Sequence, residues 1–258
     1  HQLKLMKIVF EYIKYRWNAK TLHGIHSPFV FNFMKESAKV YPVRKDLNTI
    51  QSFALKQNNN KTLKIQDHGA KSKKLKTHRS VVEIFKTSSS FGSYGILLFR
   101  ICNHFKPKNI LELGTSLGMG TLYMHLGNPT SKLISIEGCP ETYSIAKENL
   151  KPYPVKLINN TFKKVIETFS EEKFDLVFID GHHDGKALIE YLEALNPLTH
   201  ADTIFVLDDI RWSNSMRDSW GKLSTSDTYN LSIDFFRMGV LVKRPQQVKE
   251  NFILRFKK

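Results

Sequence analysis

The stretch that decides the fold runs from residue 110 to residue 121, Ile110-Leu-Glu-Leu-Gly-Thr-Ser-Leu-Gly-Met-Gly-Thr121. Apolar residues on both sides of Glu112 lead into a turn with three glycines, and a helical pattern follows. Glycines let the backbone pass close to a ligand, and the first N–H groups of a helix have no partner within that helix. The stretch therefore predicts a strand, a ligand-binding turn and a helix.

The glycine spacing excludes two common phosphate-binding turns. A dinucleotide-binding turn has Gly-x-Gly-x-x-Gly, whereas the glycines here fall at 114, 118 and 120, and no Gly-Lys-Ser/Thr follows them. Glu112 stands two residues before the first glycine. A carboxylate at that place suits a cationic ligand better than a pyrophosphate.

From about residue 91, short apolar runs rich in β-formers alternate with helical stretches, which is typical of a parallel sheet covered by helices. The predicted strands are Asn109–Leu113, Lys132–Ile136, Val155–Ile158, Phe174–Ile179 and Thr203–Leu207. Helices are expected near residues 94–105, 119–126, 140–150, 161–169 and 185–195. Two further strands, Ile233–Lys243 and Asn251–Lys257, are expected to pair antiparallel across the turn at Arg244-Pro245.

Charge divides the 258 residues into two parts. Residues 1–90 contain 18 Lys and Arg against 5 Asp and Glu, whereas residues 91–258 contain 21 against 19. We expect residues 1–90 to be a basic, mainly helical N-terminal extension with a mobile loop over 56–80, and residues 91–258 to be the ligand-binding domain. Residues 3–17 have the spacing of an amphipathic helix, and Ser27-Pro28 is expected to begin a second helix that ends near Ala38.

The basic extension suggests an anionic partner, either nucleic acid, phospholipid or an acidic small molecule, although a merely solvated basic face fits as well. Five basic side chains of the expected loop cluster around and after Gly69: Lys71, Lys73, Lys74, Lys76 and Arg79. No apolar run is long enough for a transmembrane helix. Cys102 and Cys139 form no metal or redox motif, so we expect a cytoplasmic protein, with peripheral membrane contact as an alternative.

The glycine turn resembles the first motif of the class I S-adenosylmethionine-dependent methyltransferases, an acid-x-Gly-x-Gly/Ser-x-Gly turn. The resemblance covers about residues 85–258 and implies a Rossmann-like sheet of seven mostly parallel strands whose last hairpin is antiparallel. It implies S-adenosylmethionine as the cofactor, with an acid at the end of the second strand, Glu137, on the ribose hydroxyls. The cofactor-binding residues that it implies are Glu112, Gly114, Thr115, Ser116, Gly118, Glu137, Asn160, Thr161 and Asp180.

Acidic residues follow the next two strands, in Asp180-Gly-His-His-Asp184 and in Asp208-Asp209. Carboxylates that meet at one sheet edge suit Mg²⁺ or Mn²⁺, so Asp180, Asp208 and Asp209 are predicted metal ligands. The arrangement resembles the metal-dependent catechol and caffeoyl-CoA O-methyltransferases, although Asp209 stands where these have Asn.

Two histidines stand where the same relatives carry a lysine base. His183 occupies the lysine position, and a histidine accepts a proton near neutral pH. We predict His183 as the base, with His182 as the alternative and Asp180 beside them in the catalytic group. Two other roles stay open for both histidines, as metal ligands or in packing around the following helix. Trp212 lies where relatives shape the acceptor pocket, or it closes the core.

These patterns predict transfer of a methyl group to a hydroxyl oxygen of a small molecule or glycan, with help from a divalent cation. One alternative is methylation of RNA (tRNA or rRNA) bound through residues 1–90. Another is a non-catalytic protein that binds a membrane surface or a partner through the first helix. All three fit the sequence, which does not address the oligomeric state.

Overall fold

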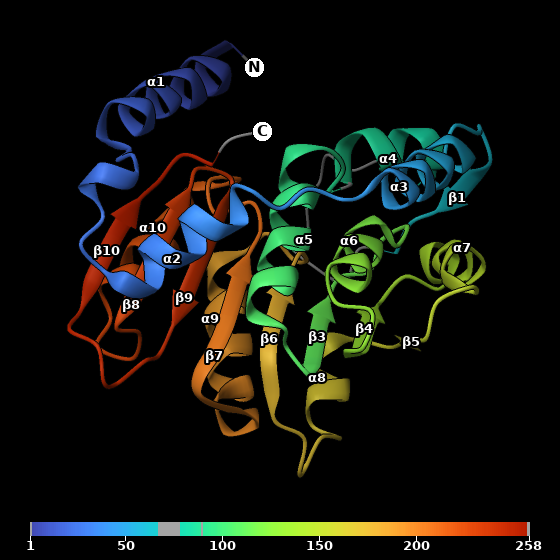
Figure 1. Ribbon diagram of the computed structural model, residues 1–258. Coiled ribbons are helices and arrows are strands. Elements are labelled where there is room, and N and C mark those ends of the chain that lie inside the picture. The colour runs from blue at the N-terminus through green and yellow to red at the C-terminus, as the bar shows by residue number, and fades with distance from the viewer. Residues whose placement is uncertain (1, 67–77, 89, 257–258) are drawn as a thin grey trace.

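In the computed structural model, which describes residues 2–66, 78–88 and 90–256, one twisted sheet separates two layers of helices (Figure 1). Its eight strands lie in the order β10-β8-β9-β7-β6-β3-β4-β5. The strands are β3 (Asn109–Leu113), β4 (Lys132–Glu137), β5 (Val155–Asn159), β6 (Phe174–Ile179), β7 (Thr199–Leu207), β8 (Leu231–Phe235), β9 (Met238–Val242) and β10 (Glu250–Ile253). The five predicted strands of the parallel part are confirmed, and β3 and β6 have the predicted bounds.

The C-terminal part of the sheet differs from the prediction. The sheet has eight strands instead of seven, and the antiparallel hairpin joins β8 and β9 across Phe236 and Arg237. The expected turn at Arg244-Pro245 lies beyond β9, and β10 pairs parallel to β8. The predicted strand Ile233–Lys243 contains the hairpin turn. The chain reverses there at Phe236, which adopts a φ of 73°. Strands β3 to β7 are parallel neighbours, so their carboxyl ends meet at one edge.

Alternate residues of the central strands enter two separate cores, because the sheet is covered on both faces. On β6, Leu176 and Phe178 join one core, whereas Val177 and Ile179 join the other. Figure 1 shows α2 (Pro28–Ser37) and α5 (Ser93–Phe105) in front of the sheet and α8 (Phe162–Ile166) and α9 (Gly185–Leu195) behind it. The other helices of this part are α6 (Met119–Gly127), α7 (Pro140–Leu150) and α10 (Asn214–Thr225).

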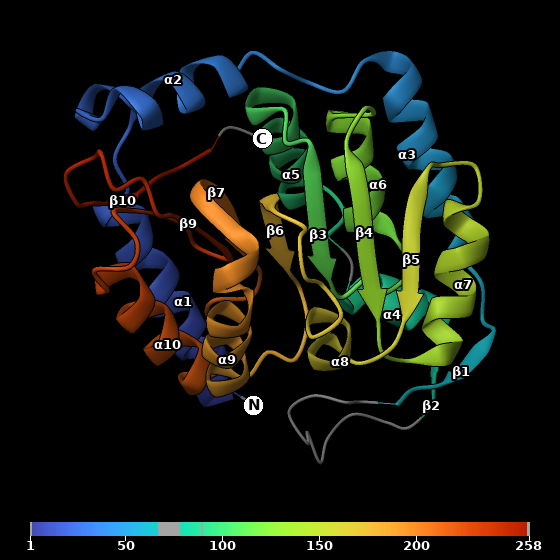
Figure 2. The same cartoon turned by 90° about the horizontal axis from the view of Figure 1, so that it is seen from below.

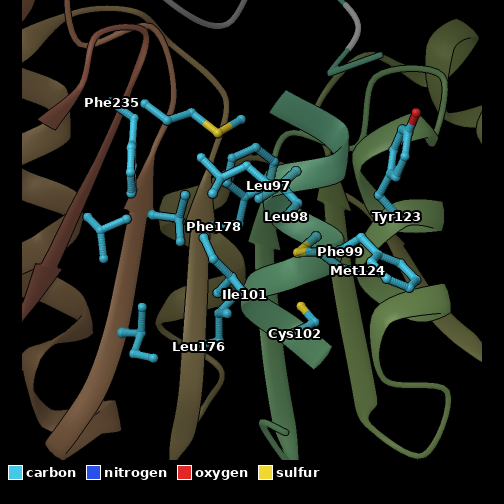
Figure 3. Close-up of a cluster of buried hydrophobic side chains, with 14 of the residues drawn as sticks. Leu97, Leu98, Phe99, Ile101, Cys102, Tyr123, Met124, Leu176, Phe178 and Phe235 are labelled. Atoms are coloured by element: carbon cyan, nitrogen blue, oxygen red, sulfur yellow. The ribbon is translucent and has the colours of Figure 1, made fainter. Parts of the chain in front are cut away.

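The front core is built mainly by α5 and α6 against the middle of the sheet. Figure 3 shows Leu98 and Ile101 of α5 beside Leu176 and Phe178 of β6, with Phe235 of β8 at one side. All five side chains are at most 1% exposed. Burial of a large apolar side chain stabilises the fold by about 1.5–3 kcal/mol, so this cluster fixes the position of β6, whose last residue directly precedes Asp180.

The N-terminal segment forms α1 (Gln2–Asn18), α2, α3 (Arg44–Lys56), β1 (Thr62–Lys64), β2 (His78–Ser80) and α4 (Val81–Ser88). The predicted first two helices are present, whereas the sequence did not indicate α3 or α4, and the expected loop contains the antiparallel pair β1–β2. Figure 2 shows α1, α4, β1 and β2 at the end of the molecule toward which the arrowheads of β3, β4 and β5 point.

Side chains of the N-terminal segment pack into the same core as α5 and α6, with Val30 and Phe33 almost fully buried. By contrast, most of the described apolar side chains of α1 are exposed, Phe10 at 70% and Trp17 at 88%, whereas Tyr15 is buried. The division into residues 1–90 and 91–258 stays a prediction. Lys71, Lys73, Lys74 and Lys76 lie outside the described residues. None of the described helices is both long enough and apolar enough to cross a membrane.

Helices α5 and α6 cross closely because Gly127 has no side chain. A Cβ atom at Gly127 would lie 2.4 Å from the Phe99 carbonyl oxygen, whereas one at Gly221 of α10 would meet no atom within 4 Å. We expect Gly221→Ala to stabilise the protein by up to about 1 kcal/mol through helix propensity. Gly127→Ala is expected to destabilise it by about 1–3 kcal/mol, since the helices must separate. Thermal unfolding of both variants checks this, and a stabilised Gly127→Ala protein would contradict the packing.

Candidate functional site

The glycine turn is clamped between the ends of two neighbouring strands. Gly114 adopts a φ of 108°, and a Cβ atom there would lie 2.1 Å from the Asp180 carbonyl oxygen. The Gly114 N–H donates to the Ile136 carbonyl at 3.0 Å, and the Asp180 N–H donates to the Leu113 carbonyl at 2.9 Å. Only glycine fits a position that combines this φ with such a close approach.

A cavity of about 780 Å³ lies over this turn, at the edge where the parallel strands end. Its volume falls within the range of about 300–1,000 Å³ that small-molecule sites have. The predicted site residues in its lining are Gly114, Ser116, Glu137, Thr161, Asp180, His182, His183 and Asp209. A small adjoining cavity is bordered by Ser90, Glu112, Gly114, Thr115, Ser116, Leu117, Met119, Gly120 and Asp180. Gly114, Ser116 and Asp180 therefore join the two cavities.

Glu137 ends β4 and faces the large cavity with an ordered carboxylate. One oxygen accepts the Ser116 N–H at 2.8 Å, and the other accepts the Cys139 N–H at 2.9 Å. These bonds fix the orientation of the carboxylate at the cavity wall. Carboxylate oxygens accept hydrogen bonds from hydroxyl groups, so Glu137 suits a ligand that carries them.

Glu112 is only 1% exposed, beneath the glycine turn. Its Oε2 accepts a hydrogen bond from the Ser135 hydroxyl at 2.5 Å and another from the Thr121 hydroxyl. Burial raises the pKa of Glu112 to about 7, although these hydroxyls oppose the shift. A cation in the small cavity would stabilise the ionised carboxylate, which is the state that suits the amino group of an amino acid.

Four other predicted cofactor residues occupy different places around the turn. Thr115 is buried and shares a 2.5 Å hydrogen bond with the Ser135 hydroxyl, so its side chain braces β4. Gly118 begins α6 against Leu150 of α7. Thr161 lines the large cavity, whereas neither Gly118 nor Asn160 is among the described residues that line either one. The roles of all these residues in cofactor binding stay predictions.

His183 lies between an acid and an aromatic ring at the cavity wall. Its Nδ1 is 3.7 Å from Asp209 Oδ2, and its ring centre is 5.4 Å from that of Trp212. Trp212 is half exposed and lines the cavity, so it contributes to the site and does not close the core. An acid beside Nδ1 leaves Nε2 for a proton acceptor role.

His182 is held by a different set of neighbours. Its Nδ1 shares a hydrogen bond with the Tyr191 hydroxyl, and its ring stacks on Tyr191 at 5.5 Å. Phe162 packs edge-on against both rings. His182 thus belongs to an aromatic layer that forms one cavity wall, which agrees with the packing alternative considered for it.

The predicted metal ligands are brought to one edge, where an arginine pairs with two of them. Arg237, from the β8–β9 turn, donates to both Asp208 oxygens, with Nε–Oδ1 at 2.9 Å and Nη2–Oδ2 at 2.6 Å. Its Nε is also 3.1 Å from Asp209 Oδ1. Asp180 Oδ2 accepts a 3.4 Å hydrogen bond from the Ser90 hydroxyl. Among the described residues, no group of three His, Cys, Asp or Glu side chains is arranged to hold a metal ion.

The pKa values of the acids reflect this crowding. Burial, followed by the negative charges of Asp208 and Asp209, raises the pKa of Asp180 well above its ordinary value of 3.8. Burial and Asp209 raise the pKa of Asp208 to about 6, against the opposing effect of Arg237. At neutral pH Asp208 is therefore ionised and forms a charge-assisted, bidentate pair with the guanidinium.

Backbone strain gathers around the large cavity. Among the described residues, seven non-glycine residues have a positive φ, and four of them line this cavity: Ser116, His182, His183 and Asp209. Conformations of this kind cost about 1–3 kcal/mol each and persist where the surrounding structure enforces them. Their concentration at one edge supports the choice of this edge as the candidate site.

Sequence reasoning missed two basic residues at this edge. Arg79 of β2 lines the cavity and donates to the Thr87 hydroxyl, although it was expected only as part of a basic loop. Arg237 pairs with acids that precede it by 29 and 28 residues. No motif marks Arg237, and its role follows only from the antiparallel pairing of β9 with β7.

Comparison with known proteins finds a family model that matches the central part of the chain. Residues 111–210 match the family model described as "Methyltransferase domain". Over 131 residues the chain is 29% identical to a protein of Niastella koreensis named catechol O-methyltransferase. That alignment covers 48% of this chain and 57% of the relative, so the chain spans little more than half the relative's length.

Solved structures share the fold. The O-methyltransferase from Bacillus cereus in complex with SAH, S-adenosylhomocysteine, superposes with a TM-score of 0.52 at 17% identity, over 81% of this chain and 96% of that one. An SAH-bound methyltransferase from Podospora anserina gives a TM-score of 0.52 at 19% identity, over 79% of this chain and 97% of that one. Residues 111–210 therefore match a methyltransferase domain, and the chain shares its fold with solved methyltransferases.

Proposed function

We propose that the protein transfers a methyl group from S-adenosylmethionine to a hydroxyl oxygen of a small molecule. The observation that carries the proposal is the pair of joined cavities at the sheet edge. Two acids, the buried Glu112 and the partly exposed Asp180, border the small cavity, and an ordered carboxylate, Glu137, lies in the large one. A ligand with a cationic end and a ribose matches this distribution of charge.

The residues present fit the cofactor. Glu112 and Asp180 border the small cavity and would hold the amino group, and Glu137 would accept hydrogen bonds from the ribose hydroxyls. Because Gly114 has no side chain, the ligand can pass close to the backbone between the two cavities. When bound, S-adenosylmethionine supplies a methyl group on a positively charged sulfur. The prediction of a divalent cation is not carried into this proposal, because Arg237 already engages both Asp208 oxygens.

His183 is the base in this proposal. It takes the hydroxyl proton of the acceptor, and Asp209 stabilises the resulting imidazolium from 3.7 Å. The acceptor oxygen then forms a bond to the methyl carbon, the carbon–sulfur bond breaks, and its electron pair remains on sulfur. Trp212 beside His183 suits a planar acceptor, which stacks on an exposed aromatic ring.

The acceptor class is proposed from the shape of the site. The cavity has the volume of a small-molecule site, and one relative is named catechol O-methyltransferase, so catechol is the first acceptor to test. The glycan acceptor, the RNA acceptor and the membrane-binding alternative stay predictions. No described feature of residues 1–90 favours one of them over the others.

Glu112→Gln tests cofactor binding and separates it from stability. Glutamine keeps an oxygen for Ser135 and Thr121 but cannot ionise. Calorimetry should show that the unmodified protein binds S-adenosylmethionine and SAH. The variant should bind them about tenfold or more weakly, since a hydrogen bond between charged groups is lost. Exposed Glu148→Gln is the control and should bind normally. Preference for NAD over SAH would contradict the proposed function.

The same variant should be more stable than the parent at alkaline pH. The pKa of Glu112 rises from 4.5 to about 7 on folding, so the folded state keeps a proton that the unfolded state loses. Stability of the parent therefore falls as pH rises from 4.5 to 7, by on the order of 3 kcal/mol. Glu112→Gln should escape this loss, and its advantage in melting temperature should be small at pH 4.5 and full at pH 8. An advantage independent of pH would contradict the assignment.

His183→Gln tests the base. With catechol as the acceptor, we expect SAH formation to fall by about a hundredfold or more, whereas the affinity for SAH should be unchanged. His200→Gln is the matched control, because His200 pairs with Asp175 near the opposite ends of β6 and β7. If His183→Gln retained full turnover, another residue would have to be the base.

A further inference from the structure

The acid cluster at the ends of β6 and β7 already contains a cation. The Asp208 side chain is fully buried, and the Arg237 guanidinium engages both of its oxygens in a bidentate pair. The same guanidinium lies 3.1 Å from Asp209, whose other oxygen lies 3.7 Å from His183. One arginine thus links the two acids after β7 to the proposed base.

Arg237 is fixed in this position by the hairpin turn that carries it. Its N–H donates to the Phe235 carbonyl at 3.0 Å, and its carbonyl accepts the Ile210 N–H at 3.0 Å. The guanidinium carbon lies 5.5 Å from the centre of the Tyr94 ring, and the Tyr94 hydroxyl donates to Phe235. Displacement of Arg237 would leave the Asp208 charge buried and unpaired, which is strongly unfavourable.

We propose that Arg237 takes the place of a divalent cation at this edge and that methyl transfer by this protein requires no metal. This inference rests on the proposed function. Mg²⁺ needs oxygen ligands at about 2.0–2.1 Å in octahedral geometry, and the Asp208 oxygens are turned toward a guanidinium plane instead. Asp209, which stands where metal-dependent relatives have Asn, supplies the second carboxylate that a fixed arginine pairs with.

Arg237 acts through Asp209 and is a positioning residue. It does not line the large cavity, whereas Asp209 and His183 do. By pairing with one Asp209 oxygen it holds the other toward His183, so the acid is already oriented when the imidazole gains the acceptor's proton. In metal-dependent enzymes the positive charge contacts the substrate oxygen. In this proposal the positive charge of Arg237 instead contacts Asp209, on the side of His183 away from the substrate.

Electron paramagnetic resonance of Mn²⁺ tests the inference without any acceptor. We expect the full-length unmodified protein to leave Mn²⁺ free, because its acids are engaged. Arg237→Gln releases Asp208 and Asp209 and should bind Mn²⁺ at least about tenfold more tightly. Arg244→Gln is the control, since Arg244 pairs with Asp202, away from the cluster, and it should behave like the parent. Equal Mn²⁺ binding by the parent and Arg237→Gln would contradict the proposal.

Turnover gives the second readout. SAH formation with catechol should continue in excess EDTA, and Arg237→Gln should lower it while SAH affinity stays within about twofold. Micromolar Mn²⁺ binding by the parent, or loss of its turnover in EDTA with SAH binding intact, would overturn the inference. Arg237→Lys replaces Arg237→Gln if the latter fails to fold, and the measurements on the parent need no variant. Failure of the parent to bind SAH would instead refute the proposed function. The Mn²⁺ measurement would then still test whether Arg237 occupies the acid cluster.

Discussion

The close approach of Gly114 to the Asp180 backbone is the constraint on which the site depends. The ends of β3 and β6 meet there with no room for a Cβ atom. Because β4 and β7 flank this pair in parallel register, the same contact brings Glu112, Glu137, Asp180 and Asp208 to one edge. Four acids from four strands are thus gathered without any sequence proximity between them.

So many carboxylates can lie close together because each has polar or charged groups of the protein as partners. Hydroxyl groups hold Glu112, and backbone N–H groups hold Glu137. Arg237 neutralises Asp208 and approaches Asp209. Asp180 has the weakest compensation, and its raised pKa records this. Glu112 and Asp180 therefore border a cavity that suits a cationic ligand, whereas Asp208 and Asp209 at the end of β7 are paired with Arg237.

The sequence predicted the parts of the fold in which local pattern and tertiary environment agree. Strands β3 and β6 are buried on both faces, so continuous apolar runs marked their bounds. Helix α3 was missed because few of its residues are buried, chiefly Ile50 and Phe53. The hairpin was misplaced because its turn at Phe236 and Arg237 lacks glycine and proline. The cofactor turn was recognisable because glycine spacing reports backbone geometry directly.

The arginine in the acid cluster was not predictable in the same way. Its partners precede it by nearly 30 residues, and the contact arises only when β9 enters the sheet beside β7. Residue types alone pointed to a metal, since three acids at one edge are a suitable ligand set. Only the pairing of β9 with β7 shows that Arg237 of the same chain neutralises the negative charge of Asp208 and Asp209.

A crystal structure of the protein with SAH bound would show directly whether these acids hold the ligand. We expect the amino group of SAH in the small cavity at Glu112 and Asp180, and the ribose hydroxyls at Glu137. We also expect the Arg237–Asp208 pair to persist. Binding of SAH elsewhere, or density for a metal ion between Asp208 and Asp209 with Arg237 displaced, would contradict these expectations.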